Sequence, residues 1–237
     1  MNHLDKTDNS IQQRVLFRFL LVILLSVLAA GLAYAVLSLP SGAPGLSVTV
    51  NENIEVSGVI NPVTAVLLNF RSYDTLLEMS VLFLALLGVW SLGSITEQTE
   101  PAPGAVLDLL SRLLVPYLIL VAGYLLWVGA HAPGGAFQAG SVLAAAGVLL
   151  LLSGWRLATR HSGLPLRFAL VLGLLVFIIV ALAMIIIGGR LLEYPQAFAG
   201  VLILVIEAAA TLSIGVTLAS LFYGGRPLQG ITGEIKR

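Results

Sequence analysis

Cysteine is absent from the 237-residue sequence, and Asp, Glu, Lys and Arg together make up only 10% of it. Without cysteine the chain cannot form disulfides, thiolate metal sites, iron–sulfur ligation or a thiol nucleophile. Soluble globular chains carry about 25% charged residues, so this chain has too few charges for a surface that faces water. Hydrophobic residues reach 58%, which indicates an integral membrane protein.

Charge balance and histidine content exclude further classes. The 12 Lys and Arg balance 12 Asp and Glu, so the charge predicts no nucleic-acid partner, and there is no basic cluster of the kind that binds a membrane surface. With three His and three Met, we expect neither a metal nor a cofactor. Membrane-embedded enzymes need clustered ligands or a nucleophile beside its base. Only His131 lies near the end of an apolar run, so we expect no catalytic activity.

Six apolar runs, nearly free of charge, are each long enough to cross a hydrocarbon core of about 30 Å, which takes about 20 helical residues. Only helices or closed barrels satisfy their backbone groups in lipid, and long Leu, Ile, Val and Ala runs without alternation favour helices. The predicted fold is therefore all-α and polytopic, with about six transmembrane helices. The spans are predicted at roughly residues 19–39, 76–95, 113–130, 136–155, 168–189 and 197–222.

Basic residues predict the orientation of these spans. If the N-terminus is cytoplasmic and the spans alternate, ten of the 12 Lys and Arg fall on the cytoplasmic side, and only Arg71 and Arg190 fall outside. Short cytoplasmic loops carry an excess of Lys and Arg, so this distribution predicts that both termini are cytoplasmic. The spacing of Asp108 and Arg112 predicts an (i, i+4) ion pair at a cytoplasmic helix start.

Residues 40–71 form the one long loop. Apolar and polar residues alternate over residues 48–56, which predicts a short strand or extended stretch outside the membrane. The apolar residues after Pro62 are too few to span the membrane and predict an interfacial or re-entrant helix. A second linker is predicted over residues 96–104, where Pro and Glu gather.

Asp74 and Glu78 stand at the start of the second span, four residues apart, so both carboxylates share one helix face. An ionisable group in lipid costs at least about 2.5–3.5 kcal/mol by insertion scales, so it is normally paired, protonated or open to a water-filled path. Arg71 is a candidate partner for these carboxylates. The alternative is a structural role, with Asp74 at the outer interface near the positive end of the helix dipole.

Glu207 is the one charged residue of the last predicted span. A charge in mid-span is costly, so Glu207 is predicted to take part in proton or ion movement. The alternative is a protonated, hydrogen-bonded Glu at a helix or subunit contact.

A tight hairpin is predicted between the third and fourth spans. Pro133 cannot continue a helix, and Gly134 and Gly135 can adopt positive φ. Gly140 is small enough for close helix contact. His131 either titrates near neutrality at the mouth of a proton or cation route or stands in the turn without such a role.

Two motifs resemble a known family. His131 and the stretch Pro133-Gly134-Gly135-Ala136-Phe137-Gln138-Ala139-Gly140 resemble the hairpin that marks the B subunit of Mrp-type multisubunit sodium/proton antiporters. Residues 69–78, with the letters NFRSYDTLLE, resemble the segment that ends the large A subunit and that forms a small separate subunit in related membrane-bound hydrogenases. The resemblance implies a two-helix part, residues 1–100, joined to a four-helix, B-subunit-like part, residues 101–237.

This resemblance implies a non-catalytic membrane subunit of a sodium/proton antiporter in a prokaryotic cytoplasmic membrane, with Na⁺, H⁺ and other Mrp-like subunits, large antiporter-like ones included, as partners. One alternative is the ion-pumping membrane arm of a redox-driven complex, similar to a membrane-bound hydrogenase or complex I; another is a scaffold between transport subunits. The candidate translocation residues are Glu78, Asp74, Glu207 and His131, and the supporting residues are Arg71, Pro133, Gly134, Gly135, Phe137 and Gly140.

Overall fold

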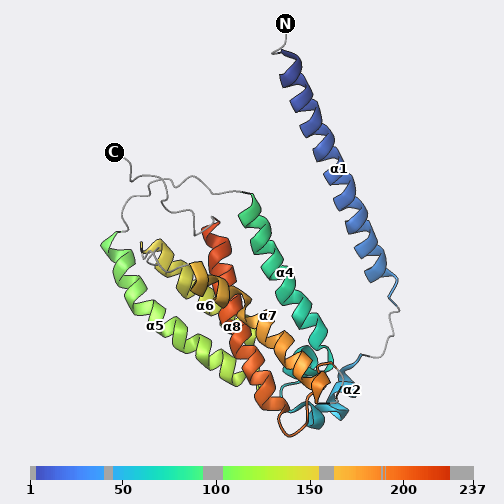
Figure 1. The fold of residues 1–237 in the computed structure, drawn as a ribbon, viewed down its shortest axis with the longest axis vertical. Helices are drawn as coiled ribbons and strands as arrows, with labels where there is room; N and C mark the ends of the chain where they lie inside the picture. Colours follow the sequence, from blue (N-terminus) through green and yellow to red (C-terminus); the bar gives the residue numbers. More distant parts are fainter. Residues whose placement is uncertain are drawn as a thin grey trace. The chain divides into compact units, whose positions relative to one another are not determined.

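The computed structural model describes residues 4–39, 45–92, 104–154, 163–187, 189 and 191–224, and this described part contains helices and no strand. The chain divides into two compact units, Met1–Leu46 and Ser47–Arg237. Figure 1 shows the helices of each unit coloured along the sequence.

The first unit consists of one long helix, α1 (Leu4–Leu37). Its segment Val15–Leu37 is long and apolar enough to cross a membrane, and none of its hydropathy window is buried. The predicted first span is therefore present.

The second unit holds five long apolar helices. Four of them qualify by length and composition as membrane spans, and the 17-residue α6 is apolar but shorter. Together with α1 these helices lie at the positions of the six predicted spans, and five of the six are long and apolar enough to cross a membrane. The five helices are α4 (Ser72–Ser91), α5 (Ala105–Val128), α6 (Ala136–Leu152), α7 (Gly163–Ile186) and α8 (Ala199–Tyr223).

Helix α8 is the centre of this unit. It contacts α4, α5, α6 and α7 (Figure 1). Ile203 and Ile206 are fully buried, and Ile214 is nearly so. The apolar core therefore surrounds α8.

Small residues let the helices approach α8 closely. A Cβ atom at Gly140 of α6 would lie 2.8 Å from Ile214 Cγ2, so the close contact predicted at Gly140 is confirmed. Gly173 of α7 likewise allows a close approach to α8. A Cβ atom at Gly173 would lie 2.9 Å from Ser213 Cβ of α8, and it would also meet the Met79 side chain of α4.

The strand or extended stretch predicted over residues 48–56 is wrong. That region forms α2 (Ser47–Glu52) and a 3₁₀ turn, η1 (Ile54–Ser57). The Asn53 side chain donates to Thr49 O at 2.8 Å and Ser57 Oγ to Ile54 O at 2.6 Å, and both bonds close helical turns. An alternating pattern needs a neighbouring strand to pair with, and the described residues provide none.

The short helix predicted after Pro62 is confirmed. It comprises α3 (Pro62–Ala65) and a π turn, η2 (Val66–Phe70). Asn61 caps it by accepting a hydrogen bond from Val63 N at 3.1 Å. This segment leads directly into α4.

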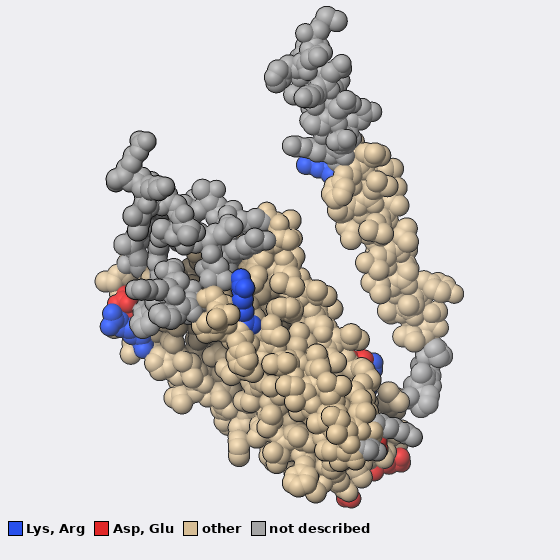
Figure 2. All heavy atoms as spheres, viewed as in Figure 1, with Lys and Arg blue, Asp and Glu red and all other residues tan. Residues whose placement is uncertain are grey.

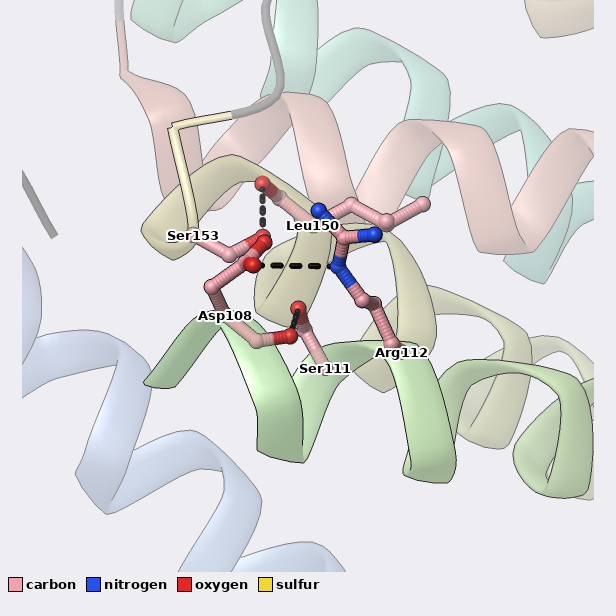
Figure 3. A network of polar contacts seen from close by, with 5 residues as sticks. All are labelled: Asp108, Ser111, Arg112, Leu150 and Ser153. Atoms are coloured by element: carbon pink, nitrogen blue, oxygen red, sulfur yellow. Dashed lines mark hydrogen bonds and ion pairs between the residues drawn. The ribbon is translucent and has the colours of Figure 1, made fainter. Parts of the chain in front are cut away.

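The start of α5 and the end of α6 lie side by side (Figure 3). Arg112 Nε donates to Asp108 Oδ2 at 3.0 Å, which confirms the predicted (i, i+4) pair.

On the face that Figure 2 shows, charged side chains are sparse and much of the described surface is uncharged, as a membrane protein requires. Half of the 12 Lys and Arg used to predict the orientation lie outside the described residues, so the orientation stays a prediction.

Candidate functional site

The most unusual charged group in the described structure is Glu207. It lies on α8 with only 2% of its surface exposed. Its carboxylate accepts a hydrogen bond from the backbone N–H of Ala136, the first residue of α6. The second carboxylate oxygen, Oε2, has no hydrogen-bond partner among the described residues. Glu207 therefore occupies the N-terminal end of α6, where the helix dipole favours negative charge.

The glycines of the hairpin make this arrangement possible. Gly135 has φ +109° and ψ −175°, a region that is essentially restricted to glycine. A Cβ atom there would lie 3.0 Å from Glu207 Oε1. Gly135 N donates to Leu125 O at 2.9 Å, which fixes the hairpin to α5. The sequence predicted a tight turn at these glycines, and the structure shows that the turn also brings α6 against the carboxylate.

Thr211 completes the surroundings of Glu207. Its hydroxyl donates to Glu207 O at 2.8 Å and lies 3.5 Å from Ala136 O. Thr211 is buried, and it was missed in the sequence because a threonine in a span carries no signal of its own.

Two further buried side chains, Asn61 and Thr64, were also missed. Asn61 Nδ2 donates to Gly129 O at 3.0 Å and to Ala132 O at 2.8 Å, and Thr64 Oγ1 donates to Gly129 O at 2.6 Å. The backbone N–H groups of Ile60 and Asn61 both donate to Ala130 O. These bonds satisfy carbonyl groups left open where α5 ends. The segment before α4 therefore holds the hairpin in place.

His131 lies on the exposed side of the hairpin. It lines a cavity of about 600 Å³ together with Glu55, Trp127 and Leu204. Phe137 packs against the apolar core, whereas Pro133 is exposed. The hairpin thus has an exposed side at His131 and a buried side at Gly135.

The second predicted cluster lies where α4 begins. Arg71 and Asp74 form an ion pair whose side chains are 60% and 42% exposed. Glu78 is exposed on α4, whereas Thr75 and Met79 are buried. Arg71 is therefore paired with Asp74. The structure does not give Glu78 the buried setting of Glu207.

A buried tyrosine packs close to this cluster, in the loop between α7 and α8. Burial raises the pKa of the Tyr194 hydroxyl to about 12, and the Ser72 hydroxyl lowers it by a smaller amount. Tyr194 therefore stays neutral at ordinary pH. Among the described residues no three His, Asp or Glu side chains come together in a way that could hold a metal ion.

The described residues contain five helices long and apolar enough to span a membrane, one shorter apolar helix and a buried carboxylate at a helix end, which define a polytopic helical membrane protein. Residues 106–223, about half of the chain, match the family model described as a domain related to the MnhB subunit of Na⁺/H⁺ antiporter. The chain belongs to this MnhB-related family and is a multi-pass protein of the cytoplasmic membrane. The match begins in α5 and ends with α8.

Two solved structures share the fold. One is a chain of the membrane-bound sulfane sulfur reductase, an archaeal respiratory membrane complex; it is 26% identical, with a TM-score of 0.63, and the match covers 88% of this chain and 97% of that one. The other belongs to the Mrp complex from Dietzia sp. DQ12-45-1b, with 23% identity and a TM-score of 0.60. The match covers 92% of this chain but only 26% of that chain. No curated protein matches the chain.

Proposed function

We propose that the chain is a non-catalytic membrane subunit of an Mrp-type cation/proton antiporter complex, where it takes part in ion or proton translocation and in assembly. The single observation that carries this proposal is the setting of Glu207. Its side chain is 2% exposed within a membrane-spanning helix. Ionisable groups in such positions mark ion pathways and proton relays.

The geometry of Glu207 suits it to hold and release a proton. One carboxylate oxygen accepts the Ala136 N–H, while Oε2 has no partner among the described residues. The proton would be carried on Oε2. The bond to α6 then persists in both protonation states, and the helix dipole stabilises the charged state.

Glu78 suits a contact with a neighbouring subunit. It is exposed on a helix long and apolar enough to span the membrane. A carboxylate that faces lipid is costly, so we infer that a partner subunit or a hydrated path covers it. The exposed ion pair of Arg71 and Asp74 would set the local field. Na⁺ and H⁺ are the proposed ions.

The rest of the proposal concerns organisation. The partners would be other Mrp-like membrane subunits, including large antiporter-like ones. Residues 1–100 and 101–237 would correspond to the A-subunit-like and B-subunit-like parts, with both termini cytoplasmic. The family match from residue 106 to 223 supports the second part.

A redox-driven complex is the second candidate. The observation in its favour is the likeness to the chain from the archaeal respiratory complex, which covers nearly all of both chains. In that case this chain would belong to an ion-pumping membrane arm, and the redox cofactors would lie in partner subunits.

One purification tests the proposal and separates the two candidates. The C-terminus is tagged, the chain is purified in mild detergent, its companions are identified by mass spectrometry, and iron and flavin are assayed in the same sample. Antiporter-like membrane subunits without iron or flavin support the antiporter. Iron–sulfur or flavin subunits support the redox-driven complex. A chain that purifies alone contradicts both.

A further inference from the structure

The cavity beside His131 has walls that continue toward Glu207. It lies where α5 ends and α8 begins, has a volume of about 600 Å³, and is called the end cavity below. Its lining includes Glu55, Trp127, His131, Gly200 and Leu204. Most of the lining is apolar, with one carboxylate and one imidazole.

One wall is a single face of α8. Gly200, Leu204, Glu207 and Thr211 follow one another at intervals of four, three and four residues, so they lie along one stripe of the helix. Gly200 and Leu204 line the end cavity. Glu207 lies one turn further along the same stripe, and Leu204 is the side chain between the cavity and the carboxylate.

The opposite wall is the hairpin, which runs in the same direction. Ala130 and His131 line the end cavity, whereas Gly135 and Ala136 meet the Glu207 carboxylate. Both walls therefore pass from the cavity to Glu207. Asn61 holds the hairpin at this place through its bonds to Gly129 O and Ala132 O.

The surroundings of Glu207 favour this direction of access over others. Ile203 and Ile206 are fully buried, and Thr211 is 5% exposed. Leu204, in contrast, is partly exposed and already faces the cavity. The nearest opening on the described stripe of α8 is therefore at Leu204.

We propose that the end cavity is the aqueous entrance through which protons reach Glu207, with Leu204 as the apolar barrier between water and the carboxylate. This inference rests on the proposed role of Glu207. Glu55 and His131 supply polar groups that hold water at the mouth. An apolar side chain at a constriction limits water beyond it, as in channels that gate by dewetting.

The absence of cysteine makes the entrance directly testable, because each introduced cysteine is the one thiol of the chain. Val201→Cys, Leu204→Cys and Val205→Cys are made in the full chain and purified with its complex in nanodiscs, which leave both membrane faces open. Each is treated with a positively charged methanethiosulfonate reagent, and labelling of this chain is measured by mass. Val201 and Leu204 line the cavity, whereas Val205 is exposed but lies outside the lining.

We expect Val201→Cys and Leu204→Cys to react at least about tenfold faster than Val205→Cys, because the thiolate that reacts forms in water and not in lipid. Labelling of Val201→Cys without Leu204→Cys would show that water stops above the barrier and would overturn the inference. No labelling at either position would indicate a cavity filled by lipid and would overturn it too. Equal rates at all three positions would also contradict it. Ala130→Cys, on the hairpin wall, replaces Leu204→Cys if that variant does not assemble.

Transport by Glu207→Gln, measured in reconstituted vesicles, separates this inference from the proposed function. If Glu207→Gln loses transport and Leu204→Cys is not labelled by the reagent, the proposed function is supported and the proposed entrance is contradicted. Labelling as expected together with normal transport removes the function and the entrance with it, because water would then reach Leu204 beside a carboxylate that transport does not need.

Discussion

The two intramembrane carboxylates, Glu207 and Glu78, look alike in the sequence and differ in the fold. Glu207 is buried and receives an N–H from the start of α6, whereas Glu78 is exposed on α4. The chain itself provides the setting of Glu207. For Glu78, we propose that a neighbouring subunit provides one. A carboxylate within a span can thus serve either the interior of its own subunit or a contact with another.

The largest expected effect is at Glu207. In Glu207→Gln the amide keeps the volume and an oxygen that accepts from Ala136 N–H, but it carries no exchangeable acid proton. We expect the complex to assemble and cation-dependent proton transport in inverted vesicles to fall at least about 100-fold. Normal transport in an intact complex would show that Glu207 has a structural role only. The difference between Glu207 and Glu78 would then be one of burial and not of function.

Glu78→Gln sharpens the comparison because its effect should depend on partners. Glu78 is exposed in this chain, so we expect the stability of the purified full-length chain to change by no more than about 0.5 kcal/mol. Within the complex, transport or the retention of a neighbouring subunit should decline. Thermal unfolding of the chain and quantitative co-purification check the two parts. A large loss of stability in the chain alone would show that Glu78 has an internal role after all.

Gly135→Ala tests whether the hairpin is built around Glu207. Alanine at φ +109° is strained, and its Cβ would lie 3.0 Å from Glu207 Oε1, so we expect a loss of about 1–3 kcal/mol in thermal unfolding. Gly123→Ala on α5 is the matched control, because a Cβ there meets nothing within 4 Å. In a helix this control should be neutral or stabilising by up to about 1 kcal/mol. Equal effects of the two variants would contradict the assignment of Gly135.

The smallest effect is expected at the ion pair beside Glu78. The side chains of Arg71 and Asp74 are 60% and 42% exposed, and exposed pairs contribute only about 0.2–1 kcal/mol. Asp74→Asn should therefore change the unfolding temperature of the chain very little. If it reduces transport as much as Glu78→Gln does, the pair acts on Glu78 through the local field; unchanged transport would separate Asp74 from the route.

The sequence was sufficient for those features that depend on local chemistry. Lipid imposes helices on long apolar runs wherever they occur, and a lone charge in such a run, as at Glu207, is visible without a structure. The partners of Glu207 were not visible. Ala136 and Asn61 carry no signal, because the bonds they make join residues about 70 positions apart. The alternation of apolar and polar residues over 48–56 wrongly predicted a strand. The same alternation also occurs in short helices whose turns are closed by side-chain hydrogen bonds to the backbone, as at Asn53 and Ser57.

The bonds from Asn61 and Thr64 to the hairpin have a consequence for the order of biogenesis. Asn61 leaves the ribosome well ahead of the carbonyls of Gly129 and Ala132, which lie 68 and 71 residues later. The polar groups of the early segment therefore gain these partners only after the hairpin between α5 and α6 has been made. Correct insertion of α5 and α6 is then a condition for these bonds to form, because the hairpin that accepts them joins these two helices.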